Sequence, residues 1–320
     1  MSTKALDVAK AFGEALVELG EKNPKVVIVE ADLADSCRSD LFRDRFPERT
    51  VDVGVAEATA VAVGAGMAYS GKIPFVNTFA VFASARAFDQ VRQLVAYGRA
   101  NVKICGSAAG LSLGYAGSSH HALEDIALMR SQPNMVVVSP CDAVETRQMV
   151  HAIAEIEGPV YLRLSRAKKP LIYDENYRLE IGKAVILREG SDVALFATGD
   201  MVFETLEAAD MLADLGILAE VVNIHTIKPL DVDTISRVAR KTQAIVTVED
   251  HSIIGGLGSA ISECLGEYVP THMRRIGLRD IFCESDSTNV LREAYGMSPQ
   301  HIVDAATEVM RLSKATIAMH

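Results

Sequence analysis

The sequence has 320 residues, of which 49% are hydrophobic and 23% are charged, and its formal net charge is -10. This length favours two domains at roughly 100–200 residues each, and the apolar content excludes a mainly disordered chain. Because Lys and Arg form no dense run in an acidic chain, we expect no nucleic-acid partner.

The pattern at the start of the chain predicts an amphipathic helix and no signal peptide. We expect no membrane span, since no apolar run approaches the roughly 18 uncharged residues that crossing a bilayer needs. The cysteines are odd in number and never form a CxxC pair, which favours neither a disulfide framework nor a metal site and fits a reducing cytoplasm. They are Cys37, Cys105, Cys141, Cys264 and Cys283.

Short apolar strands alternate with helical stretches through the first half of the chain. Such alternation predicts an α/β domain with a mostly parallel sheet flanked by helices. We place this first domain at residues 1–165. The predicted strands are 26–30, 73–79, 102–106, 135–139 and 160–164, and the predicted helices are 11–20, 56–71, 85–97, 121–132 and 143–156.

Residues 166–184 lose helical periodicity and carry Pro, Tyr and charge, so we interpret them as a linker. Strand and helix then alternate again over 185–320, which predicts a smaller second α/β domain. Its predicted strands are 193–199, 219–224, 244–250 and 273–279, and its predicted helices are 202–216, 231–242, 255–268 and 301–313.

Glu57 is the only charged residue between Val53 and Gly71, and it begins a predicted helix that is apolar on every face and is therefore expected to be buried. Burying an unpaired carboxylate costs several kcal/mol, so Glu57 is expected to be protonated or to have a specific partner. It is either a first-turn residue favoured by the helix dipole, or a general acid/base or cofactor ligand.

Phe79 and Phe82 lie three residues apart where a strand gives way to a helix. Two such aromatics usually belong to a core. Together with a buried Glu57, however, they predict a flat aromatic slot beside a carboxyl group, a shape suited to a neutral planar heterocycle.

These features belong to a longer series of motifs that resembles the C-terminal two-thirds of transketolase, namely its pyrimidine-binding domain followed by its C-terminal domain. The resemblance covers essentially the whole chain and implies the thiamine-diphosphate-binding fold. Its landmarks are EADLADS (30–36), GVAEA (54–58), TFAVF (78–82), AGSSHHALEDIALMRSQPNMVVVSP (116–140), YLRLSRAKKP (161–170), NIHTIKPLD (223–231) and VEDHSIIGGLGSAI (248–261). IKPLD and GGLGS also resemble 1-deoxyxylulose-5-phosphate synthase and 2-oxoacid dehydrogenase beta subunits.

The resemblance implies that thiamine diphosphate is the cofactor. Glu57 matches the glutamate that hydrogen-bonds the aminopyrimidine ring and makes its amine basic, and Phe79 and Phe82 match the aromatics that pack on this ring. Asp32 matches an acidic residue between the active sites; alone, it would suggest an Asx turn. Ala85 stands where the family usually has a tyrosine, so this wall of the slot is open or supplied by another group.

The resemblance also implies contacts to sugar phosphate substrates. Ser36 and Arg166 match residues that grip the phosphate, although alone they would suggest a helix cap and a surface arginine. His120 matches the histidine that bonds the reacting oxygens, with Glu124 placed to orient it, and His121 beside it is a further substrate-binding candidate. Their alternative is a solvated pair at a helix start. Two family positions for polar substrate contacts carry alanine, Ala108 and Ala116.

Family members hold Mg²⁺ or Ca²⁺, and through it the cofactor's diphosphate, with a Gly-Asp-Gly motif and a later Asn. No GDG occurs in this sequence, so we expect no metal site in this chain. The resemblance implies that an N-terminal transketolase subunit supplies the metal and the diphosphate site in an α2β2 heterotetramer. It also implies that the second domain mainly builds the dimer, and we interpret His251 and the GGLG turn in that domain as structural.

The function implied is transfer of a two-carbon ketol unit from a ketose to an aldose, by a transferase that is active only with its partner. Two alternatives stay open. One is the beta subunit of a 2-oxoacid dehydrogenase, which has the same architecture. The other is a non-catalytic homologue that binds a partner or a metabolite, which Ala108 and Ala116 leave possible.

Overall fold

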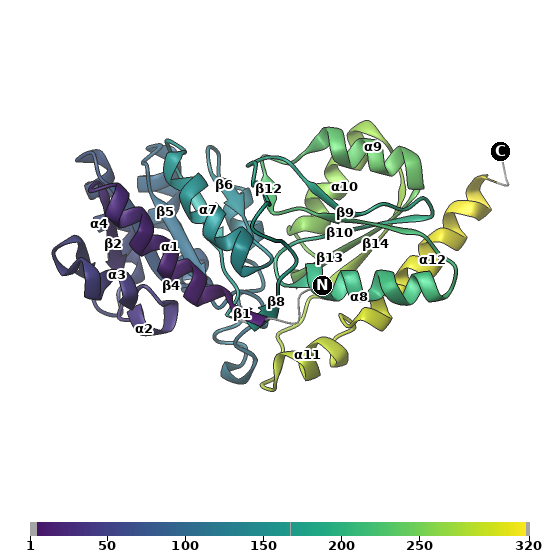
Figure 1. Ribbon diagram of the computed structural model, residues 1–320, viewed down its shortest axis with the longest axis horizontal. Coiled ribbons are helices and arrows are strands. Elements are labelled where there is room, and N and C mark those ends of the chain that lie inside the picture. Colours follow the sequence, from purple (N-terminus) through teal and green to yellow (C-terminus); the bar gives the residue numbers. More distant parts are fainter. Residues whose placement is uncertain (1–4, 167, 318–320) are drawn as a thin grey trace.

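The computed structural model describes residues 5–166 and 168–317. It consists of two α/β units side by side, each with a mostly parallel sheet covered by helices (Figure 1). The predicted fold class is therefore confirmed.

The first unit contains a seven-stranded sheet in the order β12-β6-β7-β5-β4-β2-β3. All neighbours in this sheet are parallel except β12, which pairs antiparallel with β6 at the edge. The strands are β2 (Val26–Glu30), β3 (Thr50–Asp52), β4 (Ile73–Phe79), β5 (Lys103–Ser107), β6 (Val136–Val138), β7 (Val160–Arg163) and β12 (Thr226–Lys228).

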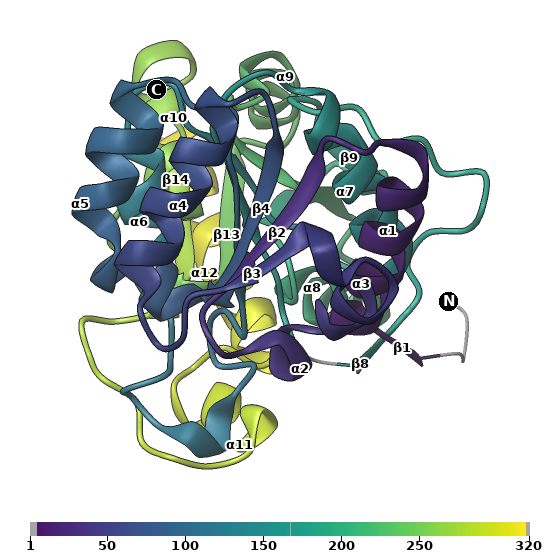
Figure 2. The ribbon, with the colours of Figure 1, turned by 90° about the vertical axis from the view of Figure 1, so that its left-hand side faces the viewer.

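Helices cover both faces of this sheet. Figure 2 shows α4, α5 and α6 on one face and α1 and α7 on the other. Their bounds, with those of two short helices after β2, are α1 (Val8–Lys22), α2 (Ala34–Cys37), α3 (Asp40–Arg45), α4 (Glu57–Tyr69), α5 (Phe88–Gln90), α6 (Asp125–Arg130) and α7 (Ala143–Glu155). Short 3-10 turns lie at Pro47–Arg49 and Gly114–Ala116.

The α4 helix packs on the sheet through its small residues. A Cβ added at Gly64 would lie 2.6 Å from Val76 Cγ2 on β4, so only glycine allows this close approach. The opposite face of α4 is not buried, and Tyr69 is exposed. The prediction that the whole helix is buried is therefore wrong for this chain by itself, because the sheet covers only one side of α4.

The segment predicted as one helix over 85–97 has a different form. It starts earlier, with a π-helical turn at Phe82–Arg86, continues through α5 and ends in a second π-helical stretch at Val91–Tyr97. A π-turn bonds residue i to residue i+5 and is frequent at functional sites. Here Ala87 N donates to Phe82 O at 3.1 Å.

The second unit contains a five-stranded sheet in the order β14-β13-β10-β11-β9. Only β9, at the edge, runs antiparallel to its neighbour β11. The strands are β9 (Val185–Arg188), β10 (Val193–Ala197), β11 (Ala219–Asn223), β13 (Ala244–Ser252) and β14 (His272–Leu278).

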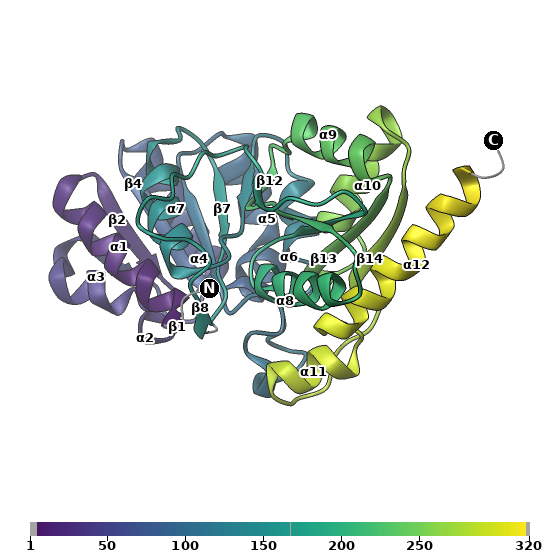
Figure 3. The ribbon, with the colours of Figure 1, turned by 45° about the vertical axis from the view of Figure 1, so that its right-hand side comes forward.

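Five helices belong to this unit, and the long α12 projects away from the first unit at its far end (Figure 3). They are α8 (Met201–Asp214), α9 (Val232–Thr242), α10 (Leu257–Tyr268), α11 (Thr288–Ala294) and α12 (Pro299–Ile317). The short α11 contacts the 3-10 turn Gly114–Ala116 of the first unit.

The segment predicted as a linker crosses between the two units and is tied to both. Its short strand β8 (Lys168–Pro170) pairs antiparallel with β1 (Ala5–Asp7) near the start of the chain. Tyr173 and Tyr177 stack with ring centroids 3.7 Å apart. The hydroxyl of Tyr177 donates to buried Glu145 at 2.8 Å, and Asn223 of the second unit donates to the Tyr173 hydroxyl at 2.9 Å.

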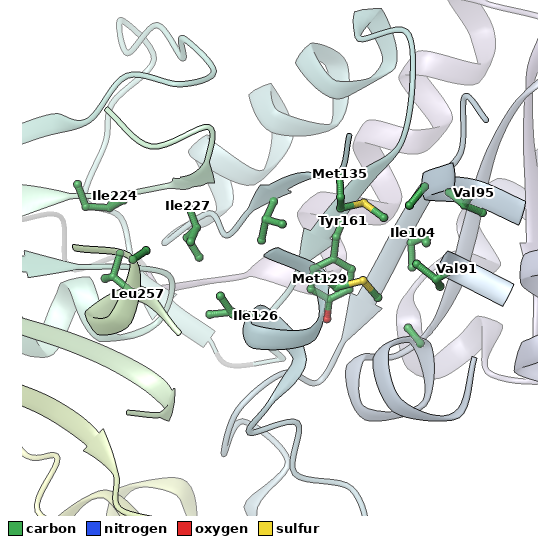
Figure 4. Packing of buried hydrophobic residues seen from close by; sticks show 14 of the residues in the cluster. Val91, Val95, Ile104, Ile126, Met129, Met135, Tyr161, Ile224, Ile227 and Leu257 are labelled. Atoms are coloured by element: carbon green, nitrogen blue, oxygen red, sulfur yellow. The ribbon is translucent and has the colours of Figure 1, made fainter. Parts of the chain in front are cut away.

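One apolar cluster runs from the first sheet into the second unit. Figure 4 shows Tyr161 and Met129 beside Ile104 of the first unit, with Ile224 and Leu257 of the second unit in the same cluster. The two units thus share a continuous core, whose burial is the main stabilising contribution to their contact.

A buried ionic network lies in the same junction. Asp125 accepts hydrogen bonds at 2.8 Å from Tyr161 and from Arg163, and Arg163 also donates to the Asp250 carbonyl at 2.7 Å. Arg292 then donates to the Asp250 carboxylate at 2.9 Å. Because each charged side chain of this network lies beside one of opposite charge, the charges can be buried together.

Candidate active site

The candidate site residues lie mainly where the parallel strands of the first sheet end. Phe79 ends β4, Asp32 follows β2 and Arg166 follows β7, while Glu57 begins α4 beside them. The carboxyl ends of parallel strands meet at one edge of a sheet, which is where α/β proteins bind ligands.

Glu57 is buried, with a relative exposure of 2%, as its sequence context predicted. It also has the specific partner that its burial requires. Arg86 Nη1 lies 2.9 Å from Glu57 Oε1 and 3.0 Å from Oε2, while 53% of the Arg86 side chain is exposed to solvent. Both oxygens of the Glu57 carboxyl group thus accept charge-assisted hydrogen bonds from one guanidinium.

Phe79 and Phe82 form a stack rather than two walls of a slot. Their ring centroids are 6.2 Å apart at an interplanar angle of 28°. A planar ring between them would need about 7 Å, twice a contact distance of ~3.5 Å, so the predicted slot between the two rings is too narrow. The Arg86 guanidinium lies over the Phe82 ring, 4.4 Å from its centroid. A heterocycle therefore has to pack on the stack from outside.

His120 approaches this stack edge-on. Its ring centroid lies 6.1 Å from that of Phe79 and 5.5 Å from that of Phe82, at interplanar angles of 68° and 71°. The predicted orienting residue is wrong in this structure, because Glu124 accepts from the backbone N–H of Leu123. The Nδ1 atom of His120 instead lies 3.0 Å from the hydroxyl of Ser119.

His121 points elsewhere. It is buried, and its Nε2 lies 3.1 Å from the carbonyl oxygen of Gly114, in the loop before it. This position supports the loop, and it does not favour the substrate contact expected of His121.

The segment after β2 borders the same stack. Leu33 and Cys37 belong to one apolar cluster with Phe79 and Phe82. Asp32 and Ser36, which lie next to Leu33 and Cys37 in the chain, are thereby held near the rings.

Asp32 itself adopts a left-handed conformation at φ 59°, and its side chain is exposed. Its backbone N–H donates to the Asp52 carboxylate at 3.0 Å, which joins the ends of β2 and β3. Ser36 lies within α2 and does not cap a helix. Exposed Arg166 is close enough to the Cys37 thiol to lower its pKa, although burial raises that pKa to about 12 overall.

The three alanines at family positions lie around the site. Ala85 is exposed within the π-turn, directly before Arg86, and Ala116 ends the 3-10 turn of the histidine loop. Ala108 is fully buried in the cluster with Phe79, at φ 55°. A left-handed alanine is strained by about 1 kcal/mol or more, and such strain is concentrated at functional sites.

Sequence reasoning missed a second buried carboxyl group at this edge. Glu30, the last residue of β2, is fully buried, and burial raises its pKa to about 8. Asn77 donates to it at 3.4 Å. The sequence signal was an acidic residue ending an otherwise apolar strand. Arg86 was also missed, because the π-turn that brings it over Phe82 leaves no mark in the periodicity.

The glycine turn of the second unit is structural, as interpreted. Glu249 accepts from the backbone N–H groups of Leu257 at 2.7 Å and Gly258 at 2.8 Å, so a carboxylate of the chain itself caps α10. A Cβ at Gly256 would lie 2.0 Å from Glu249 Oε2. His251 is buried, and its Nδ1 lies 2.6 Å from the carbonyl oxygen of Ser252. The backbone groups that a phosphate would need are therefore already bonded.

Within residues 5–166 and 168–317, no three His, Cys, Asp or Glu side chains are grouped as a metal site would need. The helices in this part of the chain are also too short or too polar to cross a membrane.

Comparison with known proteins places these features in a family. Residues 4–170 match the family model of the transketolase pyrimidine binding domain, and residues 182–302 match that of the transketolase C-terminal domain. The chain is 46% identical over 298 residues to a 6-deoxy-6-sulfo-D-fructose transketolase subunit of Clostridium sp., covering 93% of this chain and 92% of that protein.

It is also 43% identical over 305 residues to a putative transketolase C-terminal section of Methanocaldococcus jannaschii, covering 94% of this chain and 96% of that one. Among solved structures, a split-gene transketolase described as an inactive beta4 tetramer superimposes with a TM-score of 0.88. That structure is 43% identical in sequence, and the match covers 97% of this chain and 100% of that chain.

Proposed function

The chain belongs to the transketolase family, and we propose that it is the C-terminal subunit of a two-chain transketolase that depends on thiamine diphosphate. The reaction proposed is transfer of a two-carbon ketol unit from a ketose, or ketose phosphate, to an aldose or aldose phosphate. One observation carries the proposal: a buried glutamate at the mouth of an apolar helix, joined through Arg86 to the Phe82 face of an aromatic stack.

The residues present fit the aminopyrimidine part of the cofactor. Glu57 offers a carboxyl group shielded from water, and Phe82 offers a ring face beside it. When bound, thiamine diphosphate would supply a carbon acid whose deprotonated form is the nucleophile for the ketose carbonyl. The role of Glu57 is to hydrogen-bond the ring nitrogen of the pyrimidine, a bond that is strengthened in a site of low dielectric constant.

The roles proposed for the remaining residues follow from their positions. His120, held edge-on against both phenyl rings, is placed to donate to an oxygen of a reacting sugar. Ser36 and Arg166 would bind a phosphate group, and Asp32 would lie near the cofactor. Because Ala108 and Ala116 carry no polar group, we propose that the sugar hydroxyls recognised here differ from those of the usual ketose phosphates.

A partner subunit is part of the proposal. It would be an N-terminal transketolase subunit that holds the diphosphate through Mg²⁺ or Ca²⁺, and the assembly would be α2β2. Exposed apolar side chains support association: Val55 precedes α4, Tyr69 ends α4 and Tyr97, at 84% exposure, ends the following π-helical stretch. The similarity to proteins named as transketolase subunits and sections supports the same arrangement.

The decisive experiment is Glu57→Gln in the complex with the partner subunit. We expect turnover in ketol transfer to fall by about 10²–10³, the loss typical when one electrostatic catalytic group is removed, while thiamine diphosphate still binds. Glu14→Gln, an exposed change on α1, is the control. Turnover equal to that of this control, or no binding of thiamine diphosphate by the wild-type complex in calorimetry, would overturn the proposal.

A further inference from the structure

Arg86 is the one cation that contacts both parts of the proposed pyrimidine site among the described residues. Its Nη1 bonds both oxygens of Glu57, at 2.9 and 3.0 Å, and its guanidinium lies 4.4 Å from the centroid of the Phe82 ring. A heterocycle that packs on Phe82 and bonds Glu57 requires the same two surfaces. The two cannot occupy this place together.

The local backbone explains why Arg86 reaches this place. The π-turn begins at Phe82 and ends at Arg86, four residues later. Its wider spacing brings Arg86 back over the ring from which the turn starts. Ala85 presents only a methyl group there, so the long side chain of Arg86 is the group beside Phe82.

The guanidinium of Arg86 also resembles the aminopyrimidine in shape. A guanidinium is flat, stacks on aromatic faces and directs N–H donors along one edge. The aminopyrimidine is likewise flat, with its nitrogen atoms on an edge. Arg86 therefore presents to Glu57 and Phe82 a smaller group of the same shape.

The hydrogen bonding of Glu57 differs between the two arrangements. Opposite Arg86 both of its oxygens accept hydrogen bonds. The ring nitrogen of a neutral pyrimidine is itself an acceptor, so a bond to it needs a proton on Glu57 or on the ring. A nearby guanidinium disfavours an additional proton at this place, since like charges repel.

We propose that Arg86 is an internal competitor of the cofactor: it holds Glu57 and Phe82 in the pairing described here, and it leaves both when the aminopyrimidine of thiamine diphosphate binds. Because half of the Arg86 side chain is already exposed, rotation of its outer bonds carries the guanidinium into solvent without unpacking the core. The inference rests on the proposed cofactor and assigns Arg86 a positioning role rather than a catalytic one.

The test measures binding of thiamine diphosphate, with Mg²⁺, to the two-chain complex by titration calorimetry. Arg86→Met removes the charge and keeps a long side chain, so we expect the cofactor to bind about tenfold tighter than in the wild type, in line with the modest strength of an exposed ion pair and cation–π contact. Arg92→Met, an exposed change in the following π-helical stretch, is the matched control and should leave affinity unchanged.

A second readout separates competition from a merely structural role. Inorganic pyrophosphate lacks the aminopyrimidine, so with Mg²⁺ it should bind the wild type and Arg86→Met equally if Arg86 competes only for Glu57 and Phe82. A structural change that altered the whole site would instead change the affinity for pyrophosphate as well.

Arg86→Lys covers the case in which Arg86→Met does not fold, because it keeps a positive charge near Glu57. Lysine lacks the flat guanidinium, so we expect an affinity about threefold higher than in the wild type. Equal or weaker affinity in the folded variants would overturn the inference while leaving the proposed cofactor intact. If neither wild type nor variants bind thiamine diphosphate, both the inference and the proposed function fail.

Discussion

Removing Arg292 from the junction between the two units should strongly destabilise the chain. Arg292 lies in α11 and is buried, with 2% relative exposure. It donates to Asp250 at 2.9 Å and to Asp200 at 3.3 Å, and it also bonds Glu204. Arg292→Met keeps the length and apolar stem of the side chain and removes only the charge and its hydrogen bonds.

The magnitude follows from what the variant leaves behind. Breaking a buried ion pair by deleting one partner costs about 3–5 kcal/mol, since the remaining charge stays buried without compensation. Asp250 keeps the N–H of Leu111 at 3.1 Å, and Glu204 keeps Lys169 at 2.7 Å, so part of the network survives. We therefore expect a loss of about 3 kcal/mol in the free energy of unfolding at pH 7, a large share of the ~5–15 kcal/mol typical of a protein.

The loss should depend on pH in a defined direction. Burial alone would raise the pKa of Asp200, but Lys169 and Arg292 hold it below its ordinary value. A carboxyl group with a lowered folded pKa adds stability that is present above its unfolded pKa and is lost as the pH falls through the folded pKa. Arg292→Met removes much of this contribution, so the deficit of the variant relative to wild type should shrink as the pH falls below 3.8, the ordinary pKa of an aspartate.

Urea unfolding followed by circular dichroism measures the effect at pH 7 and near pH 3. Arg237→Met, an exposed change on α9, serves as the control and should alter the unfolding free energy by less than about 0.5 kcal/mol. The reasoning is refuted if Arg292→Met loses less than about 1 kcal/mol at pH 7, or if its deficit is as large near pH 3 as at pH 7.

Two other changes test the carboxyl groups that the chain buries. Burial raises the pKa of Glu30 from an ordinary 4.5 to about 8, so unfolding releases its proton between these pH values and stability falls as the pH rises. Glu30→Gln should therefore gain stability relative to wild type from pH 5 to pH 9 in urea titrations. A parallel pH course for both proteins would contradict this. Gly256→Ala should cost about 2 kcal/mol in unfolding free energy, because its Cβ would lie 2.0 Å from Glu249 Oε2. Gly266→Ala on the same helix, with nothing within 4 Å, should be neutral or slightly stabilising, so equal losses at both glycines would contradict the steric argument.

The central strands of both sheets could be predicted because each is a short, bounded apolar run that the fold buries, whereas β3 and β9, which are only partly buried, were missed. β2 and β4 have the bounds that the sequence predicts. The edge strand β12 could not be predicted, since its three residues pair with β6 and no local pattern records a partner 88 or more residues away. The π-turn at Phe82 was missed for a related reason: apolar periodicity cannot distinguish it from an α-helix.

In the candidate site, too, features with a local sequence signal could be predicted, and those that depend on a distant residue could not. The burial of Glu57 followed from the absence of any other charge over 53–71, a purely local signal. Its partner did not, because Arg86 lies 29 residues further on and reaches Glu57 only through the packing of the π-turn on α4. Local pattern thus indicates which groups are buried, whereas the identity of the partner depends on tertiary structure.

The loop that carries His120 links the second unit to the proposed active site. This link is separate from the dimer-building role that the family resemblance implies for the second unit. Ser285 and Thr288 of the second unit donate to the carbonyls of Tyr115 and Leu111 at 2.6 and 2.9 Å, and Ser118 donates to the carbonyl of Cys283. These bonds fix the loop on both sides of its 3-10 turn, immediately before His120. Because a side chain can be no better placed than the backbone that carries it, the second unit positions His120 against the Phe79 and Phe82 rings.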